Sequence, residues 1–494
     1  MKLEDLFREI AVLDKLNWKP SHSISRITSD SRMAGPGTLF VACKGTRMDA
    51  HDFIGQAIQA GAAAIVCESI PESATVRHIP VIQVPSSRNV LSLVLQRFHH
   101  IPDERLKLIG VTGTNGNTTI AYLLYRLLRQ KAKAAYIGTL NYQWAEHQLE
   151  SSNTTPGPEL LIPMLAQMRQ EGVRYCVLEV SSHALDQGRV HHLPFDLAIF
   201  TQLTQDHFDY HQTMERYFQA KRLLFAAKPA PKNMLINKDC AYGRRLLEEF
   251  QSAKSYSLES AADFSARDVR TDFTGSRFNF HNAKNKPLAV EIPLSFKHNI
   301  TNTLTALGGL ALLGFEPADF LADLRRFDGI PGRLERVSQG EPFAVFVDYA
   351  HTPDAFENVL GQAAKLKPRR ILTLFGCGGD RDFGKRKLMT RAACKYSDIV
   401  VLTADNPRSE DPDRILDHMR EGLPQDGEKP CQVLEVLDRR QAIEKLISLA
   451  EEGDVLFILG KGHEDYQILG DKKIPFDDRL VARECLQRKS RVLS

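Results

Sequence analysis

The sequence predicts an α/β protein with mainly parallel sheets, divided into three domains. Its 494 residues exceed what one hydrophobic core usually holds and correspond to two to four domains. Short apolar runs rich in β-branched residues alternate with longer helical patterns along almost the whole chain, which is typical of βαβ units. Two stretches interrupt this alternation, and they predict the domain boundaries.

Ten apolar runs are expected to form the strands. They occupy residues 38–43, 62–68, 80–84, 106–111, 175–180, 196–201, 344–350, 370–376, 398–404 and 454–460. A Leu-rich pattern over 120–128 predicts a helix soon after the fourth run. Ligand sites of parallel α/β sheets lie at the carboxyl ends of the strands. The residues that follow these runs are therefore the first candidates for a site.

The two boundaries are predicted from local composition. The stretch HHIPDERL, residues 99–106, is polar, contains a proline and comes just before the strand at 106–111. In FDGIPGRLERV, residues 327–337, Gly and Pro end a long helical pattern. We therefore expect an N-terminal domain over 1–103, a central domain over 104–331 and a C-terminal domain over 332–494.

Charge and composition exclude several classes of protein. Lys plus Arg number 64 against 61 Asp plus Glu, so no strong basic field favours nucleic acid or an anionic membrane. The first residues, MKLEDLFREIAVL, do not resemble a secretory signal, and no apolar run approaches the roughly 18 residues of a membrane span. The eight cysteines lie far apart without a C-x-x-C pair, which disfavours disulfides and zinc. We expect a monomeric cytoplasmic enzyme that acts on small molecules.

The stretch GVTGTNGNTTI, residues 110–120, is close to a phosphate-binding loop. A predicted strand precedes it and a predicted helix follows, while Gly113 and Gly116 would let the backbone approach phosphate. Thr118 could place a hydroxyl on Mg²⁺. A strict P-loop has Gly where Val111 stands and Lys where Asn117 stands. By itself the stretch could equally be a glycine-rich turn.

Acidic and histidine residues are dense after two other predicted strands. Glu179 ends one strand in a position suited to holding a metal. Asp206, His207, Asp209 and His211 lie within six residues soon after the next strand. A single such residue is most often a solvated surface group, but this density favours a site.

Four strand ends in the last third of the chain are also polar. The stretches VDYAHTPDAFENV (347–359), FGCGGDRDFGKRKLM (375–389), TADNPRSEDP (403–412) and LGKGHEDYQ (459–467) each begin at the end of an apolar run. Converging strand ends of this kind form the ligand pockets of doubly wound domains.

These motifs, in this order, resemble those of the Mur ligases, the ATP-dependent amide ligases of peptidoglycan precursor synthesis. The resemblance also includes DSR and PGTLFVACKGT near the N-terminus, NTTP at 153–156, EVSSHAL at 179–185, YFQAK at 217–221 and IPGRLERV at 330–337. It implies a UDP-sugar-binding N-terminal domain, a central P-loop-type ATP-binding domain with a parallel sheet and a Rossmann-like C-terminal domain that binds an amino acid. It further implies a role in cell wall biogenesis, and so in cell shape and cell division.

The resemblance assigns the nucleotide and metal sites residue by residue. It implies that Thr118, Glu179 and His207 hold Mg²⁺, and that Lys221 is carbamylated and joins them as a metal-binding anion. Lys221, His207 and Asn117 would be the catalytic residues. The ATP-binding residues would be Gly113, Thr114, Asn115, Gly116, Asn117, Thr118, Thr119, Asn237, Asp239, Arg333 and Asp348.

The resemblance also assigns the other two substrates, UDP-N-acetylmuramoyl-L-alanyl-D-glutamate and meso-diaminopimelate. The first would be bound by Ser31, Thr46, Asn153, Thr154, Thr155, Ser181, Gln187 and Arg189. The second would be bound by Arg381, Asp405, Asn406, Pro407, Arg408, Gly460 and Glu464. In the family, DNPR accompanies diaminopimelate rather than lysine. Because diaminopimelate has one more carboxylate than lysine, a bidentate donor such as Arg408 is a natural discriminator.

The sequence departs from the family pattern at several places. The family loop GTNGKTT has its lysine replaced by Asn117, and Gln202 stands where Asn is usual. Loss of one preorganised donor at a site of developing charge costs about 3 to 4 kcal/mol, or roughly 10²- to 10³-fold in rate. Smaller departures occur at Ala50, at 295–299 and at Leu480.

These departures leave three hypotheses. The first is a working or slow diaminopimelate ligase that tolerates Asn117. The second is an impaired relative that binds its ligands and acts as a binding or regulatory protein. The third is a sister ligase that joins a different amino acid. The N-terminal segment with DSR and PGTLF argues against a folate-polyglutamating relative, in which we would not expect this segment.

Overall fold

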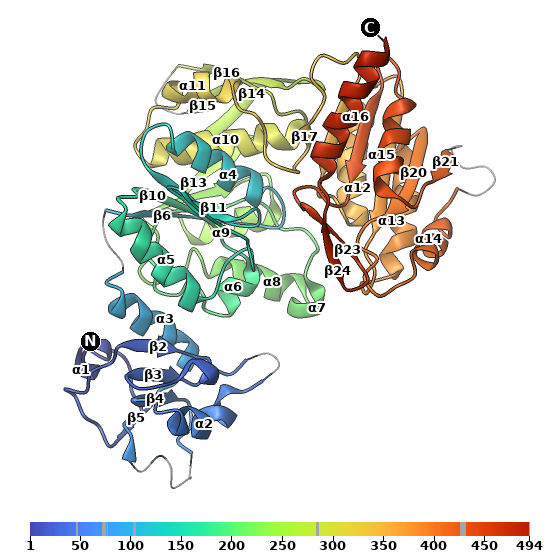
Figure 1. Ribbon diagram of the computed structural model, residues 1–494. Helices are drawn as coiled ribbons and strands as arrows, with labels where there is room; N and C mark the ends of the chain where they lie inside the picture. The colour runs from blue at the N-terminus through green and yellow to red at the C-terminus, as the bar shows by residue number, and fades with distance from the viewer. Residues whose placement is uncertain are drawn as a thin grey trace. The chain divides into compact units, whose positions relative to one another are not determined.

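The computed structural model describes residues 1–45, 48–71, 76, 78–101, 105–282, 286–424 and 431–493. Contacts divide the chain into two units. The first comprises Met1–Ser265, His281–Asn285 and Asn302–Asp319, and the second comprises Ala266–Phe280, Lys286–Thr301 and Phe320–Ser494. Figure 1 shows the elements of both, coloured along the chain, and each unit is described by itself below.

The first hundred residues form a five-stranded sheet with the order β1-β5-β4-β3-β2. Strands β2 to β5 pair in parallel, and β1 pairs with β5 in the antiparallel sense. The strands are β1 Asp14–Leu16, β2 Arg26–Thr28, β3 Thr38–Val41, β4 Ala64–Cys67 and β5 Val81–Gln83. The helices are α1 Leu3–Leu6, η1 Ser31–Met33, η2 Ala50–Phe53, α2 Ile54–Gln59 and α3 Ser87–Phe98.

The central part of the chain forms a larger sheet with the order β16-β15-β14-β13-β12-β11-β6-β10-β7-β8-β9. Its strands are β6 Lys107–Thr112, β7 Ala134–Ile137, β8 Tyr142–Trp144, β9 His147–Leu149, β10 Tyr175–Glu179, β11 Phe195–Phe200, β12 Asn233–Asn237, β13 Lys254–Ser257, β14 Phe264–Thr271, β15 Ser276–Asn282 and β16 Leu288–Ile292. Its helices are α4 Asn117–Leu128, α5 Pro158–Gln170, α6 Ser182–Asp186, α7 Phe208–His211, α8 Met214–Arg222, α9 Ala241–Glu249 and α10 Lys297–Leu312. Elements β14, β15 and α10 contribute residues to both units.

Strand β6 lies at the centre of the parallel part of this sheet. It pairs in parallel with β10 on one side and β11 on the other. The register places Glu179 opposite Val111, and Phe200 opposite Thr112. The carboxyl ends of three strands therefore meet at one edge of the sheet, and the residues after them are close together.

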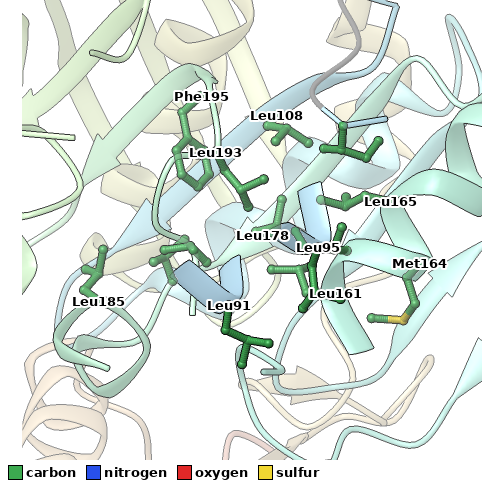
Figure 2. Packing of buried hydrophobic residues seen from close by; sticks show 14 of the residues in the cluster. Leu91, Leu95, Leu108, Leu161, Met164, Leu165, Leu178, Leu185, Leu193 and Phe195 are labelled. Atoms are coloured by element: carbon green, nitrogen blue, oxygen red, sulfur yellow. The ribbon is translucent and has the colours of Figure 1, made fainter. Parts of the chain in front are cut away.

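The two faces of this sheet are covered by different helices. Leu108 and Leu178 pack on one face against Leu95 of α3 and Leu161 of α5, and Figure 2 shows this core from close by. On the other face, a Cβ added to Gly309 of α10 would lie 3.2 Å from Leu197 and 3.7 Å from Leu124 of α4. Since α3 precedes β6 in the chain and packs with α5, one hydrophobic core joins residues before and after β6.

The second unit contains a six-stranded sheet with the order β17-β18-β22-β19-β20-β21. All pairs are parallel except β17 with β18. The strands are β17 Glu335–Arg336, β18 Ala344–Asp348, β19 Ile371–Cys377, β20 Ile399–Ala404, β21 Gln432–Glu435 and β22 Val455–Leu459, with a separate hairpin of β23 Tyr466–Leu469 and β24 Lys472–Pro475. The helices are η4 Pro317–Phe320, α11 Leu321–Arg325, α12 Pro353–Lys365, α13 Gly384–Tyr396, α14 Pro412–Arg420, α15 Arg439–Ser448 and α16 Asp478–Leu493. Of η4, only the last residue, Phe320, belongs to this unit.

This second sheet is covered on both faces. Phe346, Phe375 and Leu402 belong to one buried cluster with residues of α12, α13 and α14. Their neighbours Val345, Leu374 and Val401 belong to another with residues of α15 and α16. Because successive strand residues point to opposite faces, near-continuous apolar strands are expected in a sheet covered by helices on both sides.

The predicted fold class is confirmed in its strands. All ten apolar runs are strands to within two residues at each end, and the helix predicted over 120–128 is the greater part of α4. The sequence did not predict β14, β15 and β16, whose alternating polar residues differ from the continuous apolar pattern of the parallel strands. The boundary expected at 103/104 touches residues 102–104, outside the described residues, and both boundaries stay predictions.

No helix among the described residues is long and apolar enough to cross a bilayer. The eight cysteines are all free in the structure, and five of them are buried.

We expect Leu161→Ala to lower the free energy of unfolding by about 2 to 5 kcal/mol, because Leu161 is fully buried in the core of Figure 2. Urea unfolding followed by circular dichroism would measure the loss. Leu160, its neighbour on α5, is 41% exposed and gives the matched control Leu160→Ala, which should cost much less. Equal losses for the two variants would contradict the described packing of α5.

Candidate functional site

The loop after β6 has the backbone that close approach to an anion requires. Gly116 is the N-cap of α4 and has φ of 88°, a conformation that favours glycine. A Cβ at Gly113 would lie 1.8 Å from Thr201 Oγ1, and one at Gly116 would lie 2.7 Å from Asn302 Oδ1. Both glycines are therefore required by packing as well as by backbone geometry. The loop ends on a helix of 12 residues, whose first amides can face an anion.

Asn117 is turned back onto its own loop. Its Nδ2 donates to the Gly113 carbonyl at 2.7 Å, and its Oδ1 accepts from Thr201 Oγ1 at 3.2 Å. Thr201 also donates to the Asn115 carbonyl at 2.7 Å. Asn117 thus stabilises the loop by neutral hydrogen bonds and adds no positive charge to it.

Lys221 reaches the same loop from helix α8. Its Nζ donates to the Gly113 carbonyl at 2.6 Å, so Lys221 and Asn117 share one acceptor. The side chain is 2% exposed, and the ring of Tyr217 lies 4.8 Å from its Nζ. Burial lowers the pKa of Lys221 to about 7, and the Asp206 carboxylate opposes this shift. A large part of the lysine is therefore a neutral amine near pH 7.

Thr118 and Glu179 meet at the carboxyl edge of the sheet. The Thr118 hydroxyl donates to Glu179 Oε2 at 2.8 Å. Glu179 is 2% exposed and also accepts from Thr139 N at 2.9 Å, from Thr139 Oγ1 at 3.0 Å and from the Tyr136 hydroxyl. Several donors thus fix this carboxylate, and with the Thr118 hydroxyl it offers the hard oxygen atoms that Mg²⁺ prefers.

His207 lies in a cluster of rings with His183 and Tyr217. It is the N-cap of α7 with φ of 53°, and its Nε2 is 3.6 Å from Asp206 Oδ2. Its ring centroid is 5.0 Å from that of His183, whose pKa is lowered to about 4 by burial and by the nearby His207 and His211. Among the described residues, no three His, Cys, Asp or Glu side chains are grouped as a metal site. Of the four residues expected to hold Mg²⁺, Thr118 and Glu179 are hydrogen-bonded to each other.

Four of the eight residues expected to bind the UDP-linked substrate are linked to one another next to Glu179. Thr155 Oγ1 donates to the Glu179 carbonyl at 2.7 Å and accepts from Ser181 N at 3.0 Å. Arg189 donates to the Thr155 carbonyl at 2.7 Å and to Gln187 Oε1 at 2.7 Å. Burial lowers the pKa of the Arg189 guanidinium.

The remaining residues of that set are more scattered. Thr154 Oγ1 lies 3.3 Å from Thr139 Oγ1, and Asn153 N donates to the Tyr142 hydroxyl at 3.1 Å. Ser31 lies on η1 and donates to Gln56 at 3.0 Å. Thr46 falls outside the described residues.

Asn237 and Asp239 form a polar turn at the end of β12. Asp239 N donates to Asn237 Oδ1 at 2.9 Å, and Asp239 accepts from Leu258 N at 2.8 Å and from the Ser257 hydroxyl. In the second unit, Asp348 ends β18 and accepts from Leu334 N at 2.7 Å and from Ala350 N at 2.8 Å. There Arg333 stacks 4.7 Å from the ring of Tyr349, and its Nε is buried without a hydrogen-bond partner.

The residues expected to bind the amino acid gather at the carboxyl edge of the second sheet. Asp405 follows β20 and Gly460 follows β22, and both strands pair in parallel with β19. Asn406 Nδ2 donates to Glu464 Oε2 at 3.1 Å. Arg408 has φ of 55°, and its Nη1 donates to the Gly379 carbonyl at 2.7 Å. Pro407 is buried, and Arg381 is exposed in the loop after β19.

The hairpin β23–β24 holds the loop that carries Arg408. Arg408 N donates to the Ile468 carbonyl at 3.2 Å, and Gly470 N donates to the Arg408 carbonyl at 3.0 Å. Ile468 N donates to Asn406 Oδ1 at 2.9 Å, and Gln467 Nε2 donates to the Asp405 carbonyl at 2.7 Å. The sequence did not predict this support, because the hairpin is joined to the loop mainly by backbone groups.

Other contacts of the site were also not predicted. Thr139 and Tyr136 hold Glu179, Thr201 holds the loop, and Lys461 contacts Glu464. Of these residues, Lys461 lies within a stretch marked from the sequence as a polar strand end, and Thr201 is the last residue of the apolar run 196–201.

Comparison with known proteins identifies the family. Three family profiles match in order: the Mur ligase family catalytic domain at 23–99, the Mur ligase middle domain at 111–310 and the Mur ligase glutamate ligase domain at 332–462. A UDP-N-acetylmuramoyl-L-alanyl-D-glutamate–2,6-diaminopimelate ligase of Solibacter usitatus is 44% identical over 471 residues, which are 94% of each chain. The chain belongs to the Mur ligase family. An enzyme of the same name from a Synechocystis strain is 42% identical over 94% of this chain and 92% of its own. A solved structure with that name is 30% identical, covers 99% of both chains and has a TM-score of 0.74.

As a Mur ligase, the chain has the three-domain α/β architecture of that family. The profile of the middle domain includes the loop, Glu179 and Lys221, and that of the glutamate ligase domain includes Arg333, Asp348 and Arg408. Glu464 lies just beyond the matched range. The comparisons confirm the resemblance that the motifs carried.

We expect the stability of the protein to depend on pH through Lys221. Because the pKa is about 7 when folded and near 10.5 when unfolded, unfolding takes up a proton between these values. The free energy of unfolding should therefore rise by about 1.4 kcal/mol per pH unit over this window, relative to Lys221→Met. Urea unfolding in bicarbonate-free buffer at several pH values would measure it, with Lys19→Met, at an exposed site, as the control. If the free energy of unfolding changes with pH equally in the parent and in Lys221→Met, the lowered pKa of Lys221 is contradicted.

Proposed function

We propose that this Mur ligase joins meso-diaminopimelate to UDP-N-acetylmuramoyl-L-alanyl-D-glutamate at the expense of ATP. The observation that carries the proposal is the group formed by Asn406, Arg408 and Glu464 at one edge of the second sheet, in a chain similar along its full length to ligases of that name. The product is a peptidoglycan precursor, so the protein would serve cell wall biogenesis, cell shape and division. We propose that it acts as a monomer in the cytoplasm, where ATP and UDP-linked substrates are found.

The reaction consists of two transfers. The γ-carboxylate of D-glutamate attacks the terminal phosphorus of ATP, which forms an acyl phosphate and releases ADP. The amine of diaminopimelate then attacks the acyl carbon, the C–O bond to phosphate breaks, and an amide, phosphate and a proton result. Both steps develop negative charge on phosphoryl oxygens, so fixed positive groups and aligned amides accelerate them.

The residues assigned to the nucleotide include one group in the first unit and another in the second. The loop 113–119 offers its backbone amides and the N-terminus of α4 to the phosphates, and Asn237 with Asp239 would receive the adenine. Arg333, whose Nε is buried without a partner, and Asp348 would receive the ribose and phosphates. Thr118, Glu179 and His207 would hold Mg²⁺, which when bound neutralises charge on the phosphates.

The amino acid would be selected by its two far-end groups. Arg408 can donate two parallel hydrogen bonds to the carboxylate that distinguishes diaminopimelate from lysine. Glu464, already held by Asn406, can accept from the ammonium group at the same end. Asp405, Pro407, Gly460 and Arg381 would line the same site. Thr155, Ser181 and Arg189 with their neighbours would bind the UDP-linked peptide.

We propose further that Lys221 is carbamylated. Carbamylation requires a neutral amine, which attacks CO₂, forms an N–C bond and loses a proton to leave a negative carbamate. Lys221 meets this requirement because its pKa is lowered to about 7. Its Nζ bonds the Gly113 carbonyl, and a carbamate nitrogen retains one hydrogen that could keep this bond. The modification would turn a cation that repels Mg²⁺ into a metal-binding anion.

Isotopically labelled bicarbonate should therefore give one carbamate signal in the carbon NMR spectrum of the protein. The signal should be absent in Lys221→Arg, whose guanidinium stays protonated. Ligation by the parent should rise with added bicarbonate, while the Arg variant should stay inactive at all concentrations. No signal in the parent at pH 8 would exclude carbamylation of Lys221.

The loop itself is the reason to consider a slower or a non-catalytic protein. Asn117 adds no charge, and its amide is used within the loop. Asn117→Lys should therefore raise the rate of ligation by up to roughly 10²- to 10³-fold, since it restores a cation at the phosphates. Asn117→Gln, which keeps a neutral amide, is the matched control and should not raise it.

The assay follows ADP and ligated product with ATP, Mg²⁺, the UDP-linked dipeptide and either meso-diaminopimelate or lysine. Ligation of diaminopimelate by the parent, with lysine poorly used, supports the proposal. No turnover by the parent, with activity restored in Asn117→Lys, would instead make it a binding protein with an impaired phosphate site. If neither uses diaminopimelate but another amino acid is ligated, the chain is a sister ligase.

A further inference from the structure

Lys461 is a buried cation inside the group of residues that we assign to the amino acid. It follows β22 by two residues and is 0% exposed. Its Nζ donates to Glu464 Oε2 at 3.1 Å and to Asn406 Oδ1 at 3.4 Å, and it lies 3.5 Å from Asp405 Oδ1. Lys461 thus contacts three of the seven residues expected to bind diaminopimelate, although it was not among them. We call Lys461, Asp405, Asn406 and Glu464 the Lys461 cluster.

The contacts of Asn406 fix the orientation of this cluster. Asn406 Oδ1 faces two donors, Lys461 Nζ and Ile468 N, so its Nδ2 must point the other way, toward Glu464 Oε2. One oxygen of Glu464 therefore accepts from both Lys461 and Asn406. The carboxylate is held in one place by two donors while its other oxygen stays available to a ligand.

The charges of the cluster do not balance. Asp405 and Glu464 contribute two carboxylates, and Lys461 contributes one ammonium. Arg439 is also buried nearby, but both of its hydrogen bonds to a carboxylate go to Asp478, at 2.8 and 2.7 Å. Within the Lys461 cluster itself two carboxylates face one ammonium, and Asp405 Oδ1 is buried without a hydrogen-bond partner. A buried carboxylate whose negative charge is not fully paired with a positive group favours the binding of a cationic ligand.

We propose that Lys461 is a positioning residue that prepares this cluster for the ammonium group of the incoming amino acid, an inference that rests on the function proposed above. Lys461 contacts both carboxylates and offsets their mutual repulsion. It also holds Glu464 where a ligand ammonium can reach it. Without Lys461 the two carboxylates would repel each other, and Glu464 would no longer be held in its present position. Lys461 would not touch the reacting phosphoryl or acyl groups.

The proposal predicts a selective effect on one substrate. Lys461→Met should raise KM for diaminopimelate by about 10- to 100-fold, as expected for loss of a buried charged contact. The kcat at saturation should change by less than about threefold, and KM for ATP and for the UDP-linked dipeptide should stay unchanged. Lys461→Arg, which keeps the charge, should recover part of the loss. Lys472→Met, at an exposed lysine of the adjacent hairpin, is the matched control and should be neutral.

A double-mutant cycle separates positioning from a general structural role. If Lys461 acts by placing the Glu464 carboxylate, Lys461→Met should add little to the effect of Glu464→Gln on KM for diaminopimelate. Additive effects of the two changes, or equal increases of all three KM values, would overturn the proposal in favour of a structural role. An unchanged KM for diaminopimelate in Lys461→Met would overturn it as well.

Direct binding distinguishes this inference from the proposed function. Calorimetric titration with meso-diaminopimelate needs no turnover, so it tests the cluster even if Asn117 makes the parent slow. Binding by the parent that is lost in Lys461→Met and kept in Lys472→Met supports the inference. A parent that ligates diaminopimelate while Lys461→Met binds it equally well defeats the inference alone. A parent that neither ligates nor binds diaminopimelate defeats both.

Discussion

The pairing of β6 with β10 and β11 is the constraint on which the nucleotide site depends. The register places Glu179 opposite Val111 and Phe200 opposite Thr112, so three polypeptide segments leave the sheet side by side. Thr118 can reach Glu179, and Thr201 can reach the loop, only because of this register. A shift by one residue would send the side chains to the other face of the sheet. The same register explains why residue 113 is a glycine, because a Cβ at this position would collide with Thr201.

In the loop after β6, the neutral Asn117 and the ionisable Lys221 contact the same carbonyl group. Asn117 uses its amide to stabilise the loop, and the cation that contacts the same carbonyl comes from Lys221 on α8. Lys221 is more than a hundred residues away in sequence and is buried, which lowers its pKa to about 7. Whether this site carries a positive, neutral or negative group therefore depends on the chemical state of one lysine. That state, rather than the backbone of the loop, would set how well the site handles the charge of a transferred phosphoryl group.

The second unit follows the same principle with different residues. Its parallel strands end together, so Asp405, Gly460 and the loop with Gly379 meet at one edge. The hairpin β23–β24 holds Arg408 by backbone hydrogen bonds and Asn406 by a bond from Ile468 N to its side-chain oxygen, and Lys461 holds Glu464. Backbone contacts place the polar side chains here, and a buried lysine adjusts their charge. A site built this way can present a cation and an anion close together to a ligand that carries both.

The sequence by itself determined the fold class and ten of the strands, because parallel strands covered on both faces need continuous apolar runs. It also determined the family, because the family motifs follow the ends of these strands. It also located Glu179 at the end of a strand, and Thr118, Arg408 and Glu464 within six residues after one. Only the tertiary structure decided that Asn117 and Lys221 share the Gly113 carbonyl, that Thr139 and Tyr136 hold Glu179, and that Lys461 lies inside the group around Glu464. These contacts join residues distant in the chain, or depend on the direction of a side chain, and neither is encoded in a local pattern. The antiparallel strands β14 to β16 were missed for a related reason, since their alternating polar residues become a strand pattern only when the pairing partner is known.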